Sequence, residues 1–449
     1  MNMHQNFATG SSLRIAVIGS GISGLSAAWL LSSRHDVTLF EAESRLGGHS
    51  NTVEVAGTPV DTGFIVYNEK TYPNLTALFA HLKVRTRESD MSFAVSLDDG
   101  RLEYSGSGLR GLFGQPANLV SSRFASMLRD LLRFYRTAPG ELPFMGRLSL
   151  DAYLDANGYG IPFRDDHLYP MAAAIWSTAA SEVGRYPASA FVRFCDNHGL
   201  LQLTGRPPWR TVVGGSRTYV ARLRDAMHGR IISGTPIRQV RRQPGGVVLV
   251  DDTGTESGFD HVVIATHANQ ALALLDSPTQ AEAELLGAFG YSRNEAVLHS
   301  DPRLMPRRRA VWSAWNYLAD RRTEERLCVT YWMNKLQGLP STSPLFVTLN
   351  PIEAPDPASV AHRVVYEHPL FDIEAMGAQE RLWELQGERG VWYCGAYFGA
   401  GFHEDGLQSG LAVAEALGGV RRPWTVADES GRIPLSRRPK VSAELELVP

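Results

Sequence analysis

The first fifty residues alternate between short apolar runs and a helical stretch. Leu13 to Ile18 form an apolar run that predicts a buried parallel strand. A helix-like run, Leu25 to Ser33, follows, and a second apolar run, Val37 to Phe40, leads directly into Glu41. The order of strand, helix, strand and acid predicts a Rossmann-like α/β unit.

Further apolar runs predict strands in the middle and at the end of the chain. They are bounded by glycines and polar residues, as strands of a packed sheet usually are. The predicted elements are a strand pair, Thr235 to Val240 with Val247 to Val250, a strand within His261 to His267, a strand from Val391 to Gly395, a glycine-rich turn from Gly401 to Gly410, and a helix from Leu411 to Leu417.

Composition narrows the class of protein. The 449 residues allow two large domains or three smaller ones, and the 44% apolar and 20% charged fractions are those of a globular protein. A formal net charge of −3 excludes a globally basic nucleic-acid binder, so we expect no nucleic-acid partner. The three cysteines, Cys195, Cys328 and Cys394, are too far apart for a zinc ribbon or a disulfide framework.

The chain shows neither a signal peptide nor a convincing membrane span. Its first ten residues are polar, and the stretch from Ile15 to Leu31 is interrupted by three glycines. We therefore expect a cytoplasmic protein. The basic residues are almost all arginine, with lysine only at four positions, which indicates a bacterial genome rich in G and C and limits which lysines could be catalytic.

Residues 109–136 mix apolar residues with five arginines and a single acid, Asp130, at helical spacing. Two interpretations stay open. The segment could lie on anionic lipid as an interfacial helix, giving peripheral contact with the inner face of the membrane. Alternatively, it could be an amphipathic helix packed on the core with its arginines in water.

A glycine-rich turn connects the first strand to the first helix. In the sequence Gly19-Ser20-Gly21-Ile22-Ser23-Gly24, the first glycine permits the tight turn, the second lets the backbone approach a pyrophosphate, and the third lets helix and strand pack closely. The start of the helix then offers free N–H groups to phosphate. Glu41, 22 residues after Gly19, has the spacing of an acceptor for a ribose hydroxyl.

The residues after Glu41 resemble a known family. Ala42, Arg45, Gly47, Gly48 and His49 form a Glu-Ala…Arg-x-Gly-Gly pattern that is similar to the flavin-containing amine oxidase and phytoene desaturase superfamily. Arginine is a bidentate donor to phosphate, and paired glycines allow close approach of the backbone. The resemblance implies non-covalent FAD; covalent attachment of the flavin through His49 is the less favoured alternative.

The resemblance implies a discontinuous FAD-binding domain, to which later segments return. The overall fold is then α/β, a Rossmann-like FAD-binding domain with a mixed α+β substrate domain, as in amine oxidases. We expect the FAD-binding domain at residues 1–65, 211–275 and 386–420, the substrate domain at 66–210 and 276–385, and an irregular tail at 421–449. Further cofactor contacts are implied at Gly63, Phe64, Ile65, Ile237, Ala265, Gly395, His403, Glu404 and Leu407.

Three features argue against amine oxidation within this superfamily. Phe402 stands where amine oxidases often have a tyrosine beside the flavin, no lysine occurs between Asp251 and Asn334, and Ala396 and Tyr397 replace an expected carboxyl after Gly395. Other phrases resemble the flavoproteins associated with cyclopropane-fatty-acid synthases. These phrases include residues 174–177, 197–202, 208–216, 305–306, 312–317 and 331–334, and the most specific is Gly401 to Leu407.

The resemblance to this subgroup implies a FAD-dependent oxidoreductase that desaturates a modified or methyl-branched fatty-acyl chain, with a membrane phospholipid as the expected substrate. It also implies a functional link to a cyclopropane or methyl fatty-acid synthase. Three alternatives remain: a redox-neutral double-bond isomerase of fatty acids, a flavin amine oxidase, and a binding module without flavin chemistry, as in Rab escort proteins.

The sequence leaves the catalytic residues unassigned. Asn197, His198, Asn316 and Tyr317 are polar residues in an otherwise apolar middle segment and could orient a substrate. We expect no metal site, because the adjacent side chains of His403, Glu404 and Asp405 diverge and no second ligand cluster has suitable spacing.

Overall fold

The computed structural model describes residues 12–176, 180–203, 205–321, 328–340 and 343–435. The chain divides into two compact units. Unit 1 comprises Met1–Gly48, Val220–Phe289 and Gly377–Pro449, and unit 2 comprises His49–Tyr219 and Gly290–Met376. Both units are discontinuous, but their boundaries differ from those expected from the sequence. Residues 49–65 belong to unit 2, where Asn51 bonds to Tyr366 and Asp61 bonds to Gln337.

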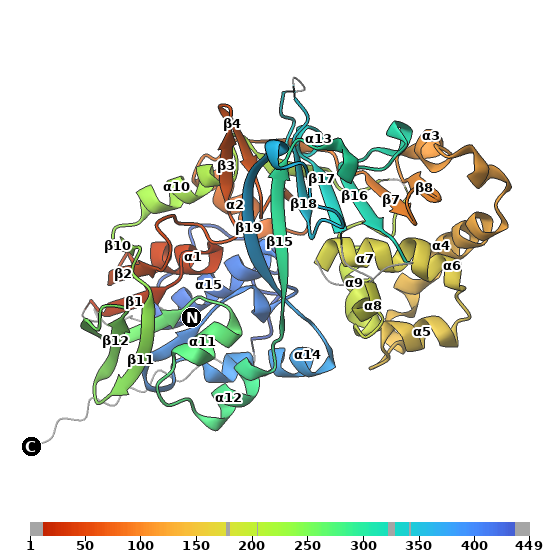
Figure 1. The fold of residues 1–449 in the computed structure, drawn as a ribbon. Helices are drawn as coiled ribbons and strands as arrows, with labels where there is room; N and C mark the ends of the chain where they lie inside the picture. The colour runs from red at the N-terminus through yellow and green to blue at the C-terminus, as the bar shows by residue number, and fades with distance from the viewer. Residues whose placement is uncertain (1–11, 177–179, 204, 322–327, 341–342, 436–449) are drawn as a thin grey trace, which may run out of the picture. The chain divides into compact units, whose positions relative to one another are not determined.

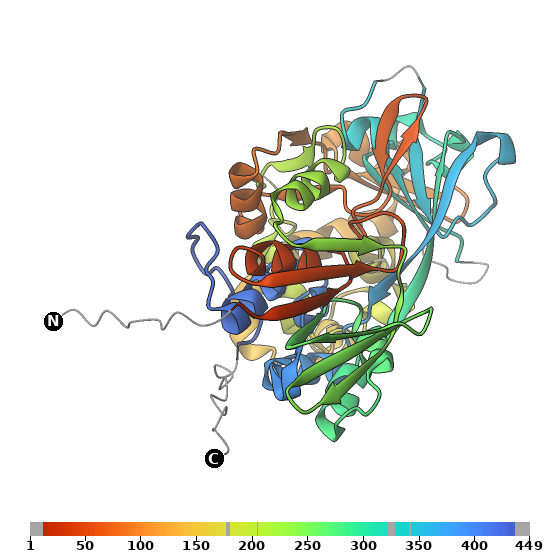
Figure 2. The same ribbon diagram turned by 90° about the vertical axis from the view of Figure 1, so that its left-hand side faces the viewer.

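The centre of unit 1 is a five-stranded parallel sheet. Its strands are β1 (Arg14–Ile18), β2 (Asp36–Glu41), β10 (Arg230–Ser233), β14 (His261–Ile264) and β20 (Val391–Tyr393), in the order β10-β2-β1-β14-β20. In Figure 2 the yellow-green strand β10 lies beside the red strands β2 and β1. The central strands are buried, which explains why they are apolar throughout rather than alternating.

Two helices pack side by side in unit 1, α1 (Ile22–Leu31) and α15 (His403–Gly418). Helix α15 begins eight residues before the helix predicted at Leu411. The prediction was wrong because glycine disfavours helix interiors. Here the missing side chain allows close packing, since a Cβ at Gly410 would lie 2.2 Å from the carbonyl oxygen of Ser23 in α1.

The remaining elements of unit 1 surround this sheet. The predicted strand pair is confirmed as part of a three-stranded antiparallel sheet, β11-β12-β13. These elements are β11 (Ile237–Gln243), β12 (Gly246–Asp251), β13 (Glu256–Phe259), α11 (Ala268–Leu274), α12 (Gln280–Gly287), η7 (Leu382–Leu385), η8 (Glu388–Gly390) and η9 (Ala396–Phe398). Helices α10 (Arg217–Ala226) and α14 (Ile373–Gln379) each run across a boundary between the units.

Unit 2 is built on a seven-stranded mixed sheet in the order β19-β15-β18-β17-β16-β7-β8 (Figure 1). Only β16 and β7 pair in parallel. The strands are β7 (Phe93–Leu97), β8 (Leu102–Ser105), β15 (Tyr291–His299), β16 (Trp315–Ala319), β17 (Cys328–Trp332), β18 (Phe346–Leu349) and β19 (Val360–Pro369).

Helices and two small sheets complete unit 2. The small sheets are β3-β4 and β5-β9-β6. The elements are β3 (Thr52–Val55), β4 (Thr58–Asp61), β5 (Val66–Asn68), β6 (Thr86–Ser89), β9 (Trp209–Val212), α2 (Pro73–His81), α3 (Gly108–Leu112), η1 (Pro116–Val120), α4 (Ser122–Glu141), η2 (Leu142–Phe144), α5 (Leu150–Ala156), α6 (Ile161–Phe163), the π-helical turn η3 (Arg164–Leu168), α7 (Tyr169–Trp176), α8 (Ala180–Val183), α9 (Ala188–Asn197), η4 (Pro302–Leu304), η5 (Arg309–Val311), α13 (Met333–Leu336) and η6 (Pro357–Ser359).

The long helix α4 turns its apolar face inward. Phe124, Met127, Leu131 and Phe134 are buried, and even the acid Asp130 is only 4% exposed. This supports packing of α4 on the core of unit 2 and leaves its main apolar face unavailable to lipid. No helix among the described residues is long and apolar enough to cross a membrane.

The expected irregular tail has a described part and a part outside the described residues, 436–449. Residues 421–435 form neither helix nor strand, yet they are anchored to unit 1. Arg422 is 2% exposed and pairs with Glu415 of α15, and the ring of Trp424 stacks on that of Trp29 in α1 at 5.9 Å. The segment is therefore irregular in backbone but held by its side chains.

Candidate functional site

The glycine turn after β1 has the geometry that the sequence predicts. Gly19 has a φ of +100°, which L side chains rarely adopt, and its N–H donates to the carbonyl of Phe40 at 2.8 Å. A Cβ at Gly24 would lie only 1.9 Å from the carbonyl oxygen of Gly19. Turn, helix and sheet therefore approach one another more closely than any side chain at these two positions would permit.

The start of α1 fits a phosphate group. Gly21 is the N-cap residue, makes no side-chain capping bond, and the first turn of the helix contains no acidic residue. A Cβ built at Gly21 would meet no atom within 4 Å. Gly21 therefore has open space beside its Cα at the positive end of a ten-residue helix, a position that fits a pyrophosphate.

Glu41 stands at the end of β2 beside this turn. Its Oε2 accepts hydrogen bonds from the N–H of Ser20 at 2.8 Å and from the Ser20 hydroxyl at 2.5 Å, and its Oε1 accepts from the N–H of Glu43. A carboxylate can accept about four hydrogen bonds. Glu41 is therefore oriented by the turn and keeps capacity for one further donor, such as a ribose hydroxyl.

The segment after Glu41 folds back onto the glycine turn. The N–H of Gly47 donates to the carbonyl and the hydroxyl of Ser20, both at 3.1 Å, and a Cβ at Gly48 would lie 3.2 Å from the Cα of Gly21. Arg45 donates to the carbonyl of Gly48 at 2.8 Å and pairs with Glu43 at 3.0 Å. Arg45 thus closes this loop, a structural role that the sequence did not reveal.

The segments that follow β14 and β20 lie at the same edge of the sheet as the glycine turn. Ala265 follows β14, and its N–H donates to the carbonyl of Ile18 at 2.8 Å. Gly395 follows β20, and its N–H and carbonyl both bond to the hydroxyl of Ser409 in α15 at 3.0 Å. Because the strands are parallel, their carboxyl ends share one edge. The first turns of α1 and α15 therefore begin close together.

The first turn of α15 holds His403 and Glu404, with Leu407 in the next turn. Glu404 and Leu407 are completely buried, and the side chain of Gln408 donates to Glu404 at 3.0 Å. A Cβ at Gly406 would lie 3.0 Å from the side chain of Ile22, so the two helix starts are in contact. Buried Asp405 caps this end, accepting from the N–H of Phe402 at 2.8 Å.

Ile237 reaches this region through the segment before it. The N–H groups of Gly234 and Thr235 donate to the carbonyls of Glu43 and Glu41, at 2.9 and 3.0 Å. Ile237 is 9% exposed and begins β11. Its backbone therefore lies near the end of β2, where the adenosine part of a dinucleotide bound at Glu41 would extend.

Four predicted site residues lie together in unit 2. The N–H of Phe64 donates to the carbonyl of His49 at 2.8 Å, and a Cβ at Gly63 would lie 2.1 Å from that carbonyl oxygen. The carbonyl of Ile65 accepts from the hydroxyl of Thr211 at 2.8 Å. His49 also stacks on Tyr366 of β19 at 5.0 Å, a contact between residues more than 300 positions apart.

The sequence analysis missed a buried acid two residues before Gly63. Asp61 accepts hydrogen bonds from Thr52, Ser216 and Gln337, the last at 2.7 Å. Burial raises its pKa to about 6, although these donors act in the opposite direction. Its partner Gln337 lines a cavity of about 180 Å³ together with Arg87. The only sequence signal was an acid close to a glycine, which is too common to select it.

The polar residues proposed to orient a substrate differ in their environments. Asn316 is buried, accepts from the N–H of Ser313, and donates to two carbonyl groups, so both its amide donors are used within the fold. This assigns Asn316 a structural role and corrects the expectation. His198 is 3% exposed and stacks on Phe194, whereas Asn197 is exposed and Tyr317 is buried. Ser177, in one of the phrases noted above, lies outside the described residues.

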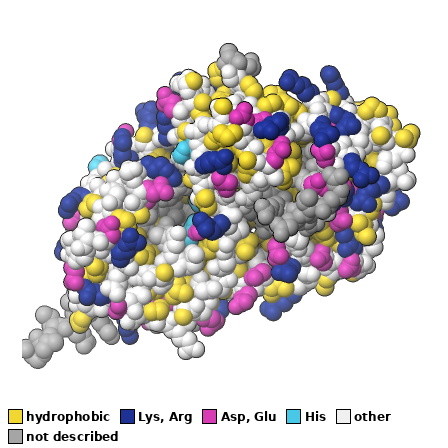
Figure 3. All heavy atoms as spheres, viewed as in Figure 1, with side chains coloured by type: hydrophobic (Ala, Val, Ile, Leu, Met, Phe, Trp, Pro, Cys, Tyr) yellow, Lys and Arg dark blue, Asp and Glu magenta, His cyan; other side chains and the backbone are white. Residues whose placement is uncertain are grey.

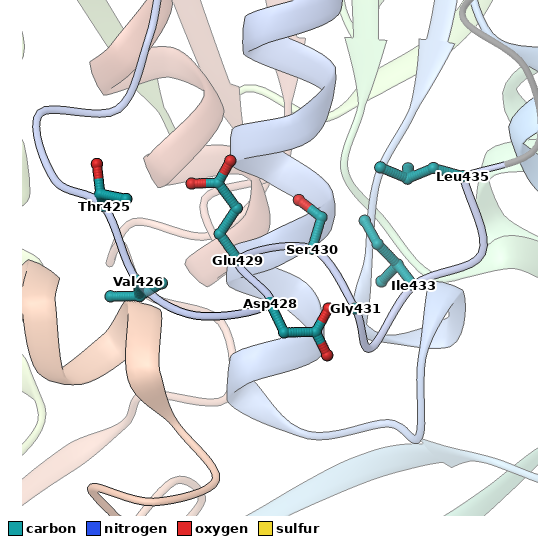
Figure 4. A pocket seen from close by; sticks show the side chains of 8 residues that line it. All are labelled: Thr425, Val426, Asp428, Glu429, Ser430, Gly431, Ile433 and Leu435. Atoms are coloured by element: carbon teal, nitrogen blue, oxygen red, sulfur yellow. The ribbon is translucent and has the colours of Figure 1, made fainter.

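The anchored segment 421–435 borders the start of α15. Arg432 donates from Nε to Oδ1 of Asp405 at 2.7 Å, and its backbone N–H donates to Gln408. Figure 4 shows the side chains of this segment around an open hollow of about 510 Å³. Thr425, Val426, Ile433 and Leu435 contribute apolar atoms, and Asp428 and Glu429 contribute carboxylates.

Comparison with known proteins gives consistent similarities. A family model described as flavin-containing amine oxidoreductase matches residues 22–303. The Mycobacterium tuberculosis protein AofH, which carries the name of a flavin-containing monoamine oxidase, is 26% identical over 289 residues, 61% of each chain. The coproporphyrinogen III oxidase of Mycobacterium leprae is 27% identical over 58% of this chain and 60% of its own.

The alignments thus span about 60% of the length of these relatives. Among solved structures, a fatty acid isomerase from P. acnes that produces CLA superposes with a TM-score of 0.64 and 16% identity. That superposition covers 90% of this chain and 97% of the isomerase, and at such low identity it shows a shared fold.

Proposed function

The chain belongs to the flavin-containing amine oxidoreductase family, whose members use FAD, and from this premise we propose that it dehydrogenates a fatty-acyl chain. The glycine turn, the uncapped start of α1 and Glu41 fit the pyrophosphate and ribose of FAD, as described above. The activity of the whole protein on acyl chains is our proposal. One observation in unit 2 carries it.

That observation is the apolar face of the seven-stranded sheet. Strand register places ten side chains of five neighbouring strands on one face, and all are apolar or aromatic. We call them the apolar face: Phe93, Val95, Ala296, Leu298, Trp315, Tyr317, Val329, Tyr331, Val347 and Leu349. Eight of the ten are buried; Phe93 and Trp315 are half-buried. Such an apolar face suits contact with a hydrocarbon chain.

The opposite face of the same sheet differs in character. His299 bonds to Thr348 at 2.7 Å, and Thr348 bonds to Thr330 at 2.9 Å, so buried polar groups on this face are paired with one another. This opposite face also carries apolar side chains, among them Val297, Leu318 and Phe346, so its polar pairs lie within a mixed face.

Trp315 supplies a hydrogen-bond donor on the apolar face. Its indole N–H is buried and has no acceptor among the residues that the structure describes. A buried donor without an acceptor is costly, so this N–H suits a polar group of the substrate. We assign it to the ester carbonyl oxygen at the head of the acyl chain, with the chain lying along the apolar face.

FAD, when bound, supplies the hydride acceptor for this oxidation. The residues of the chain contribute binding and orientation. The apolar face excludes water and aligns the chain, and the Trp315 N–H fixes its direction. The glycine turn and the start of α1 would hold the cofactor phosphates, and the start of α15 would face the electron-rich end of the flavin.

A second function is redox-neutral isomerisation of a double bond in an acyl chain. The observation that favours it is the shared fold with the P. acnes fatty acid isomerase, which also covers nearly the whole of this chain. Both functions use the same apolar face. They differ in whether the substrate loses two hydrogens.

The test is an anaerobic reaction of the purified yellow protein with acyl chains. Methyl-branched and cyclopropane phospholipids serve as substrates, with putrescine and benzylamine as controls. Loss of the flavin absorbance with an acyl product two mass units lighter supports the proposal. A shifted double bond with unchanged mass supports isomerisation instead. Reduction by the amines, with none by any acyl chain, overturns both.

A further inference from the structure

Exposed apolar side chains gather on one helical segment of unit 2. Of the large apolar residues exposed among the described part of the chain, seven lie between residues 109 and 161. The most exposed are Val120 at 88%, Phe144 at 83% and Leu109 at 75%. The others are Leu119, Leu132, Leu148 and Ile161. We call these seven residues the apolar tips, because they project from α3, α4, α6 and the connections between them.

Arginines accompany the apolar tips. Along α4, Ala125, Arg129, Leu132 and Arg136 are spaced by three or four residues and form the outward stripe of the helix, opposite the buried stripe. Arg110 and Arg147 are exposed beside Leu109 and Leu148. On the face shown in Figure 3, basic, acidic and apolar side chains all lie over the part of the molecule that Figure 1 labels α3, α4 and α6.

The acidic residues of the same segment, Asp130, Glu141, Asp151 and Asp155, each have a hydrogen-bond or ion-pair partner, although Asp151 and Asp155 are exposed. Asp130 is buried, accepts from the N–H of Gly160 at 2.9 Å and pairs with Arg129 and Arg133. Glu141 accepts from the hydroxyl of Tyr153, and Asp155 pairs with Arg164. The outward surface of α4 is thus basic and apolar, because Arg129, Leu132 and Arg136 have no carboxylate among them on that stripe.

We propose that the apolar tips and the arginines of α4 dock unit 2 on a bilayer of anionic phospholipid. The tips would enter the interface between headgroups and acyl chains, and Arg129 and Arg136 would bind phosphate oxygens. A bilayer fits better than a protein groove. The tips are single side chains standing out from short segments between arginines, rather than a continuous apolar area that a partner protein would cover.

This docking is distinct from the interfacial helix considered from the sequence. The main apolar face of α4 stays in the core, and only its outward stripe and the neighbouring turns contact lipid. The proposal concerns a surface and not the reaction. It therefore stands or falls independently of the acyl substrate proposed above.

Sedimentation of the full-length FAD-bound protein with vesicles tests the proposal. We expect binding to vesicles of phosphatidylglycerol and phosphatidylcholine, little binding to phosphatidylcholine alone, and weaker binding at high salt. Replacing both arginines, Arg129→Gln with Arg136→Gln, should weaken binding roughly 25-fold, about fivefold for each charge. The double variant Val120→Ser with Phe144→Ser should weaken it at least about tenfold.

Matched variants control for general effects of charge and hydrophobicity. Arg222→Gln with Arg230→Gln removes two exposed arginines of unit 1, and Ile352→Ser with Ile373→Ser removes two exposed apolar residues elsewhere. These controls should bind as the wild type does. Equal binding by the tip variants and their controls, or no binding of the wild type to anionic vesicles, overturns the proposal. Activity on detergent-dispersed acyl chains reports separately on the proposed function.

Discussion

Arg432 donates from Nε to the carboxylate of Asp405 at 2.7 Å, and this ion pair joins the irregular segment 421–435 to the first turn of α15. Asp405 is fully buried. Burial raises its pKa, and Arg432 acts against that rise. The carboxylate in turn holds the N–H of Phe402, so the segment positions the start of a helix that we assign to the flavin.

We predict that Arg432→Ala destabilises unit 1 and weakens FAD binding. Removing the partner of a buried carboxylate lowers the free energy of unfolding by about 3 kcal/mol. This is the low end of the usual range, because Arg432 keeps some contact with water. Thermal unfolding followed by flavin fluorescence should show a lower midpoint and earlier release of FAD. Arg421→Ala removes an exposed pair of the same segment and should change neither. Equal effects of both variants would contradict the positioning role.

Two glycines of the turn should respond differently to alanine. A Cβ at Gly24 meets the Gly19 carbonyl at 1.9 Å, so Gly24→Ala should disrupt the turn and lower the yield of folded protein. A Cβ at Gly21 meets nothing within 4 Å, so Gly21→Ala should fold normally. It would nevertheless occupy the space assigned to the pyrophosphate and weaken FAD binding. Titration of the FAD-free protein with FAD measures the affinity, and circular dichroism checks the fold.

Asp61 predicts a pH dependence of stability. Its folded pKa of about 6 lies above the ordinary value of 3.8, so the folded protein binds more protons between about pH 4 and pH 6. The contribution of Asp61 to stability is therefore present below this window and is lost as the pH rises through it. The loss amounts to about 3 kcal/mol.

The variant Asp61→Asn isolates this effect, because asparagine does not titrate. The free energy of unfolding of the wild type, minus that of the variant, should fall by about 3 kcal/mol between pH 4 and pH 7. Asp99→Asn, which removes an exposed carboxyl, is the matched control for the loss of a charge. A difference for Asp61→Asn that does not change with pH would contradict the prediction.

Trp315 should affect substrate binding without affecting chemistry. Trp315→Phe removes the indole N–H and keeps an aromatic ring on the apolar face. We expect KM for an acyl substrate to rise about tenfold, the value of one hydrogen bond, with kcat nearly unchanged. Trp312→Phe is the matched control, because the Trp312 indole donates to the carbonyl of Pro306 at 2.6 Å. That variant should lose stability and keep its KM.

Whether the sequence could predict a feature depended on how far apart in the chain the interacting residues are. The elements around Gly19 to Glu41 were predicted in the right order, although helix α1 begins three residues earlier and ends two residues earlier than predicted. A strand, a tight turn and a buried helix each leave a local pattern. The start of helix α15 was predicted too late in the chain. Its glycines are explained only by the close packing of α1 against them, which the sequence does not show. From the sequence, Asn316 was a candidate for orienting a substrate. In the structure its amide nitrogen donates to two backbone carbonyl groups that the fold places beside it.

The sequence by itself therefore determined the dinucleotide-binding turn, the acid that faces it, the α/β class and the family. These features rest on residues that are neighbours in the chain, where backbone sterics and short spacing dominate. Tertiary structure alone decided that residues 49–65 join unit 2, that α4 buries its apolar face, that Arg432 anchors Asp405, and that His49 stacks on Tyr366. Each of these features depends on contacts between residues distant in the chain. Such contacts bury side chains, and burial determines the packing energy and raises the pKa of Asp61.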